Sequence, residues 1–222
     1  MDSWLIWKLT DRAVHATDVT NASRTMLMDI HALAWDPFLL RFFGGIPPAI
    51  LPEIRSSAEH FGRLRISRLA ASGVPIAGCL GDQQAALLGQ HCLAAGQTKA
   101  TYGTGCFLLT NIGTMPVISR HGLLTTVAFR LGPAQPAYYA LEGSIGQAGS
   151  ALDWLRSVGV EPSEEGGGNG AASNAAVGHN GGARGVHVVP AFGGLLAPRW
   201  RPEARATITG QSTRQFLEIF LI

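Results

Sequence analysis

The stretch Gly81–Gln90, with the sequence GDQQAALLGQ, decides how the rest of this chain is interpreted. It follows the short apolar run Val74–Leu80, which predicts a buried strand, and it continues into residues that predict a helix over Ala85–Cys92. The acid Asp82 is therefore expected between a strand and a helix, where open α/β sheets commonly bind ligands. An Asp at this place is a good helix cap, and its carboxylate is also suited to accept the proton of a hydroxyl group.

A second informative stretch, KATYGTGCFLLT, runs from Lys99 to Thr110. Its alternation of period two is broken at Gly103-Thr104-Gly105 and then resumes, which predicts two strands joined by a tight turn. Glycines in such a turn let backbone N–H groups approach a phosphate with no Cβ in the way. Alone, the turn is more often only a hairpin turn. Together with Asp82 it has the parts that transfer of a phosphoryl group to an alcohol requires.

Composition restricts the class of protein. The 222 residues are 46% hydrophobic and 14% charged, which indicates a folded globular chain. The net charge of +2 comes from scattered residues, whereas binding to nucleic acid would need a basic stripe. No apolar run reaches the ~18 residues of a membrane span, and the N-terminus has no features of a signal peptide. We therefore expect a cytoplasmic protein that binds neither nucleic acid nor membrane.

The cysteines and histidines give no sign of a metal site. The three cysteines are odd in number and have no metal-ligand spacing, so we expect buried, reduced thiols. The histidines at 91, 121 and 187 are single residues without clustered partners. The sequence therefore predicts no metal held by protein ligands.

The hydrophobic pattern predicts alternating helices and strands, which is typical of an α/β protein. Helices are expected near Trp4–Leu9, over Ser23–Leu33 with Asn21 as its cap, from Asp36-Pro37 onwards, and over Ala148–Val158 with Leu152 and Leu155 facing inward. Further strands are expected as antiparallel pairs over Lys99–Phe129, at Tyr138–Glu142, and as a buried strand at Val186–Phe192. The glycine-rich segment Glu165–Arg184 has too little apolar area to order and is expected to be a flexible surface loop.

Both motifs and most of the remaining chain resemble the glycerol kinases of the FGGY carbohydrate kinase family. Further similar segments, in that family's order, are Asp2–Thr10, His15–Pro37, Leu51–Gly62, His121–Phe129, Tyr138–Ile145 and Pro190–Arg205. The resemblance implies the actin-like ATPase (ribonuclease H-like) two-domain kinase fold. The chain is too short for that family, so we expect a fold truncated at both ends. Residues 1–90 would belong to the N-terminal domain and residues 91–222 to the C-terminal domain.

The resemblance also implies roles for single residues on the acceptor side. Asp82 matches the family's general base, which contacts the hydroxyl group of the acceptor. Gln83 matches a glutamine that holds another substrate hydroxyl. Phe107 matches an aromatic residue that packs against the carbon atoms of glycerol. We therefore expect Asp82, Gln83 and Phe107 to bind the substrate.

On the nucleotide side, Thr104 matches a threonine that contacts the terminal phosphates of ATP, with Gly103 and Gly105 allowing the backbone to approach. Gly149 matches a nucleotide-contacting glycine at the start of a helix, where an anion is favoured by the helix dipole. Asp153, one turn later, also lies at a nucleotide-contacting position. It departs from the neutral or basic residue expected there, which would weaken such a contact.

The function implied is that of an ATP-dependent glycerol kinase of glycerol catabolism, which forms sn-glycerol 3-phosphate with ATP and Mg2+ as cofactors. Two alternatives stay open at this point. The first is that the chain belongs to a kinase for another polyol or a pentulose of the same family. The second is that it is a truncated remnant that catalyses nothing. Self-association into a homo-oligomer is also left open. Because other groups that the family uses lie outside this sequence, the isolated fragment is expected to be inactive.

Overall fold

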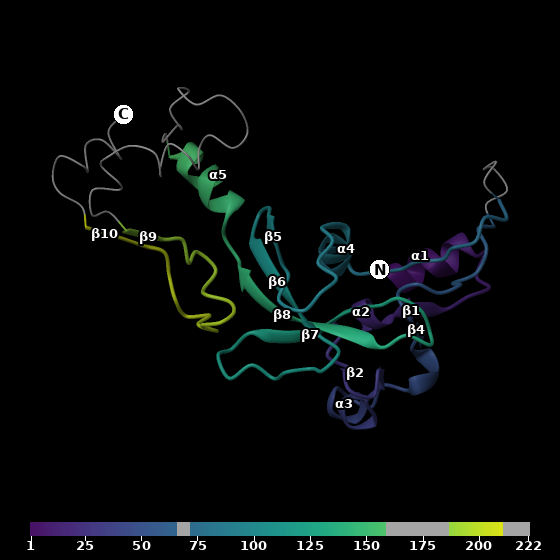
Figure 1. Cartoon of the computed structure of the whole chain (residues 1–222). Coiled ribbons are helices and arrows are strands. Elements are labelled where there is room, and N and C mark those ends of the chain that lie inside the picture. The colour runs from purple at the N-terminus through teal and green to yellow at the C-terminus, as the bar shows by residue number, and fades with distance from the viewer. Residues whose placement is uncertain (66–71, 159–186, 211–222) are drawn as a thin grey trace. The chain divides into compact units, whose positions relative to one another are not determined.

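A computed structural model describes residues 1–65, 72–158 and 187–210. The chain divides into two compact units (Figure 1). Unit 1 contains Met1–Thr101 and Leu108–Gly143, and unit 2 contains Tyr102–Phe107 and Ser144–Ile222. The glycine-rich segment Glu165–Arg184 lies outside the described residues.

Helices and strands alternate along the described chain, which confirms the predicted α/β class. The helices of unit 1 are α1 (Asp2–Leu9), α2 (Val19–Ala22), α3 (Pro37–Phe42), the 3-10 helix η1 (Pro48–Ile50) and α4 (Asp82–Gly89). Its strands are β1 (Ala16–Asp18), β2 (Met28–Asp29), β3 (Ala34–Trp35), β4 (Glu53–Arg55) and β7 (Leu124–Arg130). Strands β5 (Thr98–Tyr102), β6 (Cys106–Gly113) and β8 (Ala137–Ile145) have residues in both units, and α5 (Gly149–Ser157), β9 (His187–Val189) and β10 (Thr207–Thr209) belong to unit 2.

The largest sheet has four strands in the order β5-β6-β8-β7, and β7 pairs with β8 antiparallel. Strands β1 and β4 pair in parallel, whereas β2 with β3 and β9 with β10 form antiparallel pairs. The strands predicted from the period-two pattern over Lys99–Phe129, and the strand predicted at Tyr138–Glu142, are thus confirmed. The turn predicted at Gly103-Thr104-Gly105 is the connection between β5 and β6.

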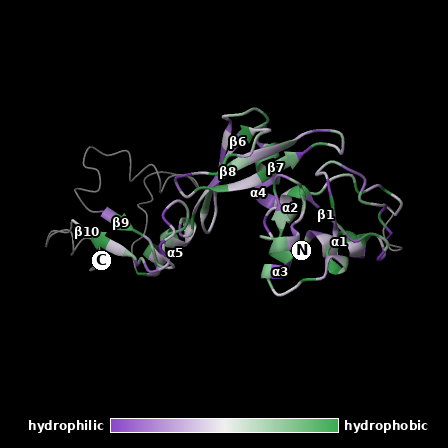
Figure 2. Ribbon diagram, turned by 90° about the horizontal axis from the view of Figure 1, so that it is seen from below, coloured by the Kyte–Doolittle hydropathy of each residue, from purple (hydrophilic) through white to green (hydrophobic). Residues whose placement is uncertain are grey.

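The main apolar core of unit 1 lies where α2 packs against β7 (Figure 2). Buried side chains from α2, β2, β7 and β8 form it, namely Val19, Ala22, Met28, Val127, Ala137 and Tyr139. The Tyr139 hydroxyl donates a hydrogen bond of 2.8 Å to the carbonyl of Ile30. This core joins the helix that follows β1 to the four-stranded sheet.

One predicted helix is wrong. Residues Ser23–Leu33 form a turn followed by β2 and the connection to β3. Met26 and Leu33 have φ angles of 60° and 53°, which a right-handed helix does not allow. The helix in this region is the short α2, and its cap is Asp18, whose side chain accepts from the backbone N–H groups two and three residues on.

The segment Val74–Leu80 is also not the buried strand that was predicted. Within the part of the chain that the structure describes, its backbone hydrogen-bonds on one side only, to residues between 57 and 64, and Pro75 forms only an isolated bridge. One-sided pairing leaves side chains of the segment in contact with solvent, and Val74 is 52% exposed. Burial was overestimated in unit 2 as well, because β9 is exposed and Leu152 on α5 is 45% exposed.

Helix starts were predicted better. Asp36 caps α3 by accepting from the N–H groups of Phe38 and Leu39, with Pro37 as the first helical residue. Gly44 and Gly45 follow the helix with φ angles of 99° and 74°, which glycine adopts without steric cost. These signals are local, so the sequence alone was sufficient.

Candidate active site

The N-terminus of α4 carries the predicted base. Asp82 is the first residue of the helix, after the cap residue Gly81, and its side chain is exposed. One carboxylate oxygen accepts a hydrogen bond of 2.7 Å from the backbone N–H of Gln83. The negative charge is favoured at the positive end of the helix dipole. Asp82 is therefore held at the helix mouth with its carboxylate accessible, whereas its catalytic role stays a prediction.

Gln83 is oriented by a residue that sequence reasoning missed. The ammonium group of Lys99 on β5 donates to the side-chain oxygen of Gln83 and also to the hydroxyl of Thr101, at 2.7 Å. Lys99 is 1% exposed, which is rare for a lysine unless it is paired. Because the amide oxygen of Gln83 is engaged, the amide nitrogen is the group suited to contact a substrate. The one feature of the sequence that could have indicated this role is that Lys99 is a single charged residue in an otherwise uncharged strand.

Gln84 points the other way, into the core of unit 1. It is buried, and its amide nitrogen donates to the hydroxyl of Thr126 at 3.3 Å. That hydroxyl also lies 3.0 Å from the hydroxyl of Ser23. Gln84 therefore ties α4 to β7 and to the end of α2, which is a structural role.

The turn Gly103-Thr104-Gly105 lies against the start of α5 within unit 2. The backbone N–H of Gly103 donates to the carbonyl of Gly105 at 2.8 Å, which closes the turn. A Cβ on Gly105 would lie 2.6 Å from the carbonyl oxygen of Ile145, and a Cβ on Gly149 would lie 2.6 Å from that of Gly103. Both distances are too short for a side chain, so glycine is required for this close approach.

The first N–H groups of α5 are used by the turn. The N–H of Gly149 donates to the carbonyl of Gly103 at 2.9 Å, while the N–H groups of Ala148 and Ser150 donate to the carbonyl of Thr104 at 2.9 and 3.2 Å. Within the described ranges, the N–H groups of Thr104 and Gly105 themselves have no hydrogen-bond acceptor. The exposed Thr104 thus presents unused donors, whereas a ligand would have to contact Gly149 through atoms other than its N–H.

The other two predicted residues of unit 2 lie on neighbouring elements. Phe107 is half-buried on β6, two residues after the turn. Asp153 lies on an exposed part of α5, where its carboxylate accepts from Arg156 at 2.8 Å. The structure thus brings Asp82 and Gln83 together in unit 1, and Gly103, Thr104, Gly105 and Gly149 together in unit 2. The roles of Phe107 and Asp153 stay predictions.

A buried ion pair lies beside the Gln84 network. Glu142 on β8 has a side chain only 2% exposed, and it accepts from Arg24 at 3.0 Å. Its second carboxylate oxygen has no hydrogen-bond partner among the described residues. Because Arg24 is 39% exposed, the pair joins the surface after α2 to the buried face of the sheet. This contact gives Glu142 a structural role.

Two groups of unit 1 have shifted pKa values. Burial, followed by the negative charges of Asp18 and Asp2, raises the pKa of the Cys79 thiol to about 12. Burial also raises the pKa of Tyr139, with Asp29 adding to the shift. The cysteines at 79, 92 and 106 are free thiols, of which Cys92 is buried. The expected burial is therefore confirmed for Cys92 alone of these three, whereas Cys79 and Cys106 are half-buried.

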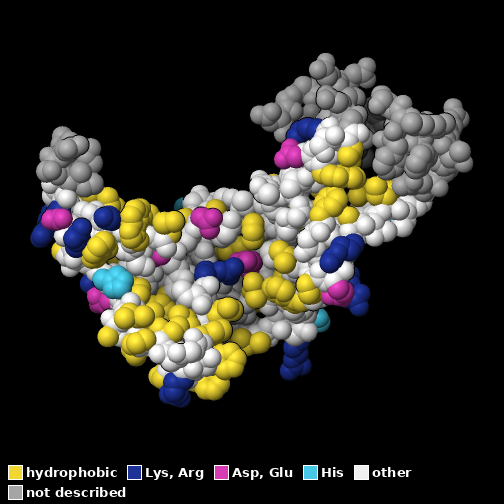
Figure 3. Space-filling model, turned by 180° about the vertical axis from the view of Figure 1, so that it is seen from behind, with side chains coloured by type: hydrophobic (Ala, Val, Ile, Leu, Met, Phe, Trp, Pro, Cys, Tyr) yellow, Lys and Arg dark blue, Asp and Glu magenta, His cyan; other side chains and the backbone are white. Residues whose placement is uncertain are grey.

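The described residues contain neither a candidate metal-binding cluster nor a candidate membrane-spanning helix. Across residues 1–65, 72–158 and 187–210, no group of three His, Cys, Asp or Glu side chains lies close enough to hold a metal ion. The helices in these ranges are also too short or too polar to cross a membrane. On the face shown in Figure 3, Lys and Arg side chains are scattered and form no continuous basic stripe.

Comparison with known proteins assigns the chain to a family. The model of the N-terminal domain of the FGGY family of carbohydrate kinases matches residues 1–89, and that of the C-terminal domain matches residues 98–221. The chain belongs to the FGGY family of carbohydrate kinases. Among its FGGY relatives, the glycerol kinase of Nocardia farcinica is 56% identical over 95% of this chain. The glycerol kinase of Pseudarthrobacter chlorophenolicus is 51% identical over 94% of it.

Solved FGGY structures show the same fold. A glycerol kinase of Plasmodium falciparum with ADP superimposes with a TM-score of 0.81 and 44% identity, over 95% of this chain and 40% of that one. A xylulose kinase of Lactobacillus acidophilus gives a TM-score of 0.76 at 21% identity, which shows the fold alone. The predicted actin-like ATPase fold is confirmed. The chain spans about 40% of the length of the curated relatives it matches.

Proposed function

We propose that the protein is an ATP-dependent glycerol kinase, which transfers the γ-phosphate of ATP to glycerol and yields sn-glycerol 3-phosphate. The observation that carries this proposal is the identity of more than half of the residues with the glycerol kinase of Nocardia farcinica, across both family domains. The site geometry supports it, because the accessible Asp82 and the turn with unused N–H donors each have the chemistry that the reaction needs.

In unit 1, Asp82 and Gln83 bind glycerol, which accepts the phosphoryl group. The Asp82 carboxylate takes the proton of a glycerol hydroxyl while the hydroxyl oxygen forms a bond to the γ-phosphorus. The bond between that phosphorus and the bridging oxygen breaks, and ADP leaves with the electron pair. The amide nitrogen of Gln83, held in place by Lys99, donates to a second glycerol hydroxyl.

In unit 2, the turn provides donors for phosphate oxygens. The unpaired N–H groups of Thr104 and Gly105, together with the Thr104 hydroxyl, bind the terminal phosphates of ATP. Phe107 supplies an apolar contact for the carbon atoms of glycerol. The bonds from α5 to the carbonyls of Gly103 and Thr104 keep the turn in one conformation, so its donors are pre-arranged.

Magnesium fits this arrangement as part of the nucleotide complex. The described residues form no cluster of side-chain ligands, and Mg2+ in kinases is bound largely by substrate phosphates and water. It would neutralise phosphate charge when bound. We further propose that the enzyme acts in the cytoplasm, in the catabolism of glycerol.

The test is a coupled assay of ADP formation by the full-length protein with glycerol, xylulose or gluconate as the acceptor. We expect kcat/KM for glycerol to exceed that for the other two acceptors by at least ~10²-fold, because a site built around particular hydroxyls rejects substrates that leave its polar groups unpaired. A preference for xylulose or gluconate would assign the protein to another kinase of the family. Absence of turnover with all three would support the remnant hypothesis.

A further inference from the structure

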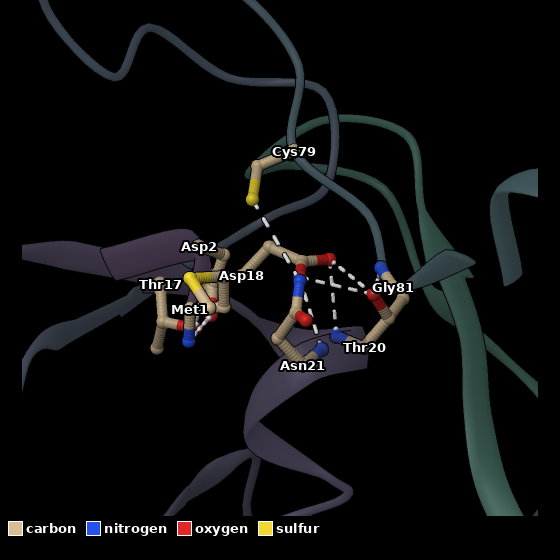
Figure 4. A network of polar contacts seen from close by, with 8 residues as sticks. All are labelled: Met1, Asp2, Thr17, Asp18, Thr20, Asn21, Cys79 and Gly81. Atoms are coloured by element: carbon tan, nitrogen blue, oxygen red, sulfur yellow. Dashed lines mark hydrogen bonds and ion pairs between the residues drawn. The ribbon is translucent and has the colours of Figure 1, made fainter. Parts of the chain in front are cut away.

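A fully buried carboxylate lies directly behind the N-terminus of α4. Asp18, the last residue of β1, is 0% exposed (Figure 4). Its oxygens accept hydrogen bonds from the backbone and side chain of Thr20, the backbone and side chain of Asn21, and the hydroxyl of Ser57. Capping the four-residue helix α2 needs only the two backbone donors. The three side-chain donors therefore indicate a second task.

The hydroxyl of Thr20 connects Asp18 to the start of α4. It donates to the Asp18 carboxylate at 2.8 Å and accepts from the backbone N–H of Gly81 at the same distance. Gly81 is the cap residue of α4 and directly precedes Asp82. Its partner lies 61 positions earlier in the chain, so this contact is purely tertiary. Because Asp18 fixes the direction of the Thr20 hydroxyl, the acceptor lone pair faces Gly81.

Two further contacts hold the segment just before α4. The backbone N–H of Cys79 donates to the carbonyl of Ser57 at 2.9 Å, and Ser57 is itself bonded to Asp18. The side-chain nitrogen of Asn21 lies 3.7 Å from the Cys79 sulfur and donates to it. Cys79 and Gly81 are thus bound to Ser57, Asn21 and Thr20, whose side chains all donate to Asp18.

We propose that Asp18 and Thr20 are positioning residues that hold the first turn of α4 and thereby aim the carboxylate of Asp82. The proposal rests on the proposed function, because it takes Asp82 as the base. Among the described residues, the only hydrogen bond to the Asp82 side chain comes from the adjacent N–H of Gln83, so the direction of the carboxylate follows the backbone of this turn. A small displacement of a reacting group is sufficient to slow a reaction strongly.

The test compares three variants of the full-length protein. Thr20→Val removes the hydroxyl with little change of shape, and Thr20→Ser restores it. Thr17→Val is the matched control, because Thr17 on β1 is also buried and, within the described ranges, its hydroxyl bonds only to Asp2. Each variant is measured for kcat, for KM of ATP and glycerol, and for hydrogen exchange of the peptide that contains Gly81.

We expect Thr20→Val to lower kcat about 10-fold while both KM values change little, because the base is present but displaced. Amide exchange at Gly81 should become faster, since its acceptor is removed. Thr20→Ser should restore both, and Thr17→Val should alter neither. This pattern separates positioning from a general loss of stability, which would affect the two valine variants alike.

Other outcomes overturn the proposal. If Thr20→Val speeds exchange at Gly81 but leaves kcat unchanged, the anchor does not position the base. If Thr17→Val lowers kcat as much as Thr20→Val, the effect is structural only. An unmodified protein without glycerol kinase activity would defeat the proposed function instead. In that case the exchange rates still decide the anchoring, and unchanged exchange in Thr20→Val would refute it.

Discussion

The N-terminus of α4 in unit 1 and the turn before β6 in unit 2 are held in place by different means. The start of α4 is held largely by side chains from distant parts of the chain, including the hydroxyl of Thr20 and the buried cation of Lys99. The turn at 103–105 is held mainly by backbone carbonyls that accept from the first N–H groups of α5. Glycines 105 and 149 make that backbone contact close enough.

This difference follows from what each region has to present. A base is a side chain, so its carboxylate is aimed by fixing a helix turn, and buried polar side chains do this when all of them are hydrogen-bonded. A phosphate cradle is made of backbone N–H groups, so it needs bare backbone and close approach. Removing a side chain should therefore damage the first region, whereas adding a single methyl group should damage the second.

The sharpest test of the first region is to change the group that it presents. Asp82→Asn in the full-length protein should lower kcat by at least ~10²-fold with a smaller effect on the KM of ATP, because general-base assistance contributes 10²–10⁴-fold. Steady-state kinetics with glycerol measure this. Asp11→Asn is the control, since Asp11 is exposed and has a φ of 52° that asparagine tolerates. A kcat of Asp82→Asn close to that of the unmodified protein would remove Asp82 from the mechanism.

The ion pair between Arg24 and Glu142 tests whether unit 1 depends on its buried polar side chains. Arg24→Met leaves the Glu142 carboxylate buried without its partner, and we expect unfolding to become easier by about 3 kcal/mol, at the low end for buried pairs because Arg24 is partly exposed. Urea unfolding at neutral pH measures this. The double variant Arg24→Met with Glu142→Leu should recover much of the loss, since no buried charge remains. A double variant as unstable as the single one would show that packing, and not charge, is responsible.

These two regions also differ in how far the sequence predicted them. The caps and turns depend on neighbouring residues, so the start of α3 at Asp36-Pro37 and the glycine turn were correct. The placement of Asp82 at a helix mouth was correct for the same reason. Lys99 and Asp18 were missed, because their roles depend on tertiary contacts that no local pattern records.

The incorrect elements failed for related physical reasons. Residues Ser23–Leu33 have a helical spacing of apolar side chains, yet Met26 and Leu33 adopt left-handed φ angles. Tertiary packing against β7 and β8 determines this segment, and it overrides a weak local preference. The apolar run Val74–Leu80 predicts a strand by its hydrophobicity, but hydrophobicity does not determine how many hydrogen-bonded neighbours a segment has.

The second region is tested by adding a methyl group. In Gly149→Ala the new Cβ would lie 2.6 Å from the carbonyl oxygen of Gly103, so the turn and α5 must separate. We expect the KM of ATP to rise about 10-fold, because the phosphate donors are displaced. Gly146→Ala is the matched control, since its Cβ would meet only the end of the Leu196 side chain at 3.4 Å. Equal KM values for the two variants would contradict the role assigned to the close approach.

Thiol reactivity can compare the two regions, because each region contains one cysteine. Of these tests, it has the smallest consequence for function. Cys79 lies beside the buried Asp18, and burial together with the charges of Asp18 and Asp2 raises the pKa of its thiol to about 12. Since the thiolate is the reactive form, iodoacetamide at pH 8 should label Cys79 at least ~10²-fold more slowly than a cysteine of ordinary pKa. Cys106, directly after the glycine turn, is the internal reference.

The raised pKa also fixes the direction of the pH dependence, because labelling of Cys79 should keep increasing above pH 9, where a thiol of ordinary pKa is already largely ionised. Peptide mass spectrometry after timed labelling gives both rates, and equal rates at pH 8 would show that the Asp18 region is more open to solvent than its hydrogen bonds imply.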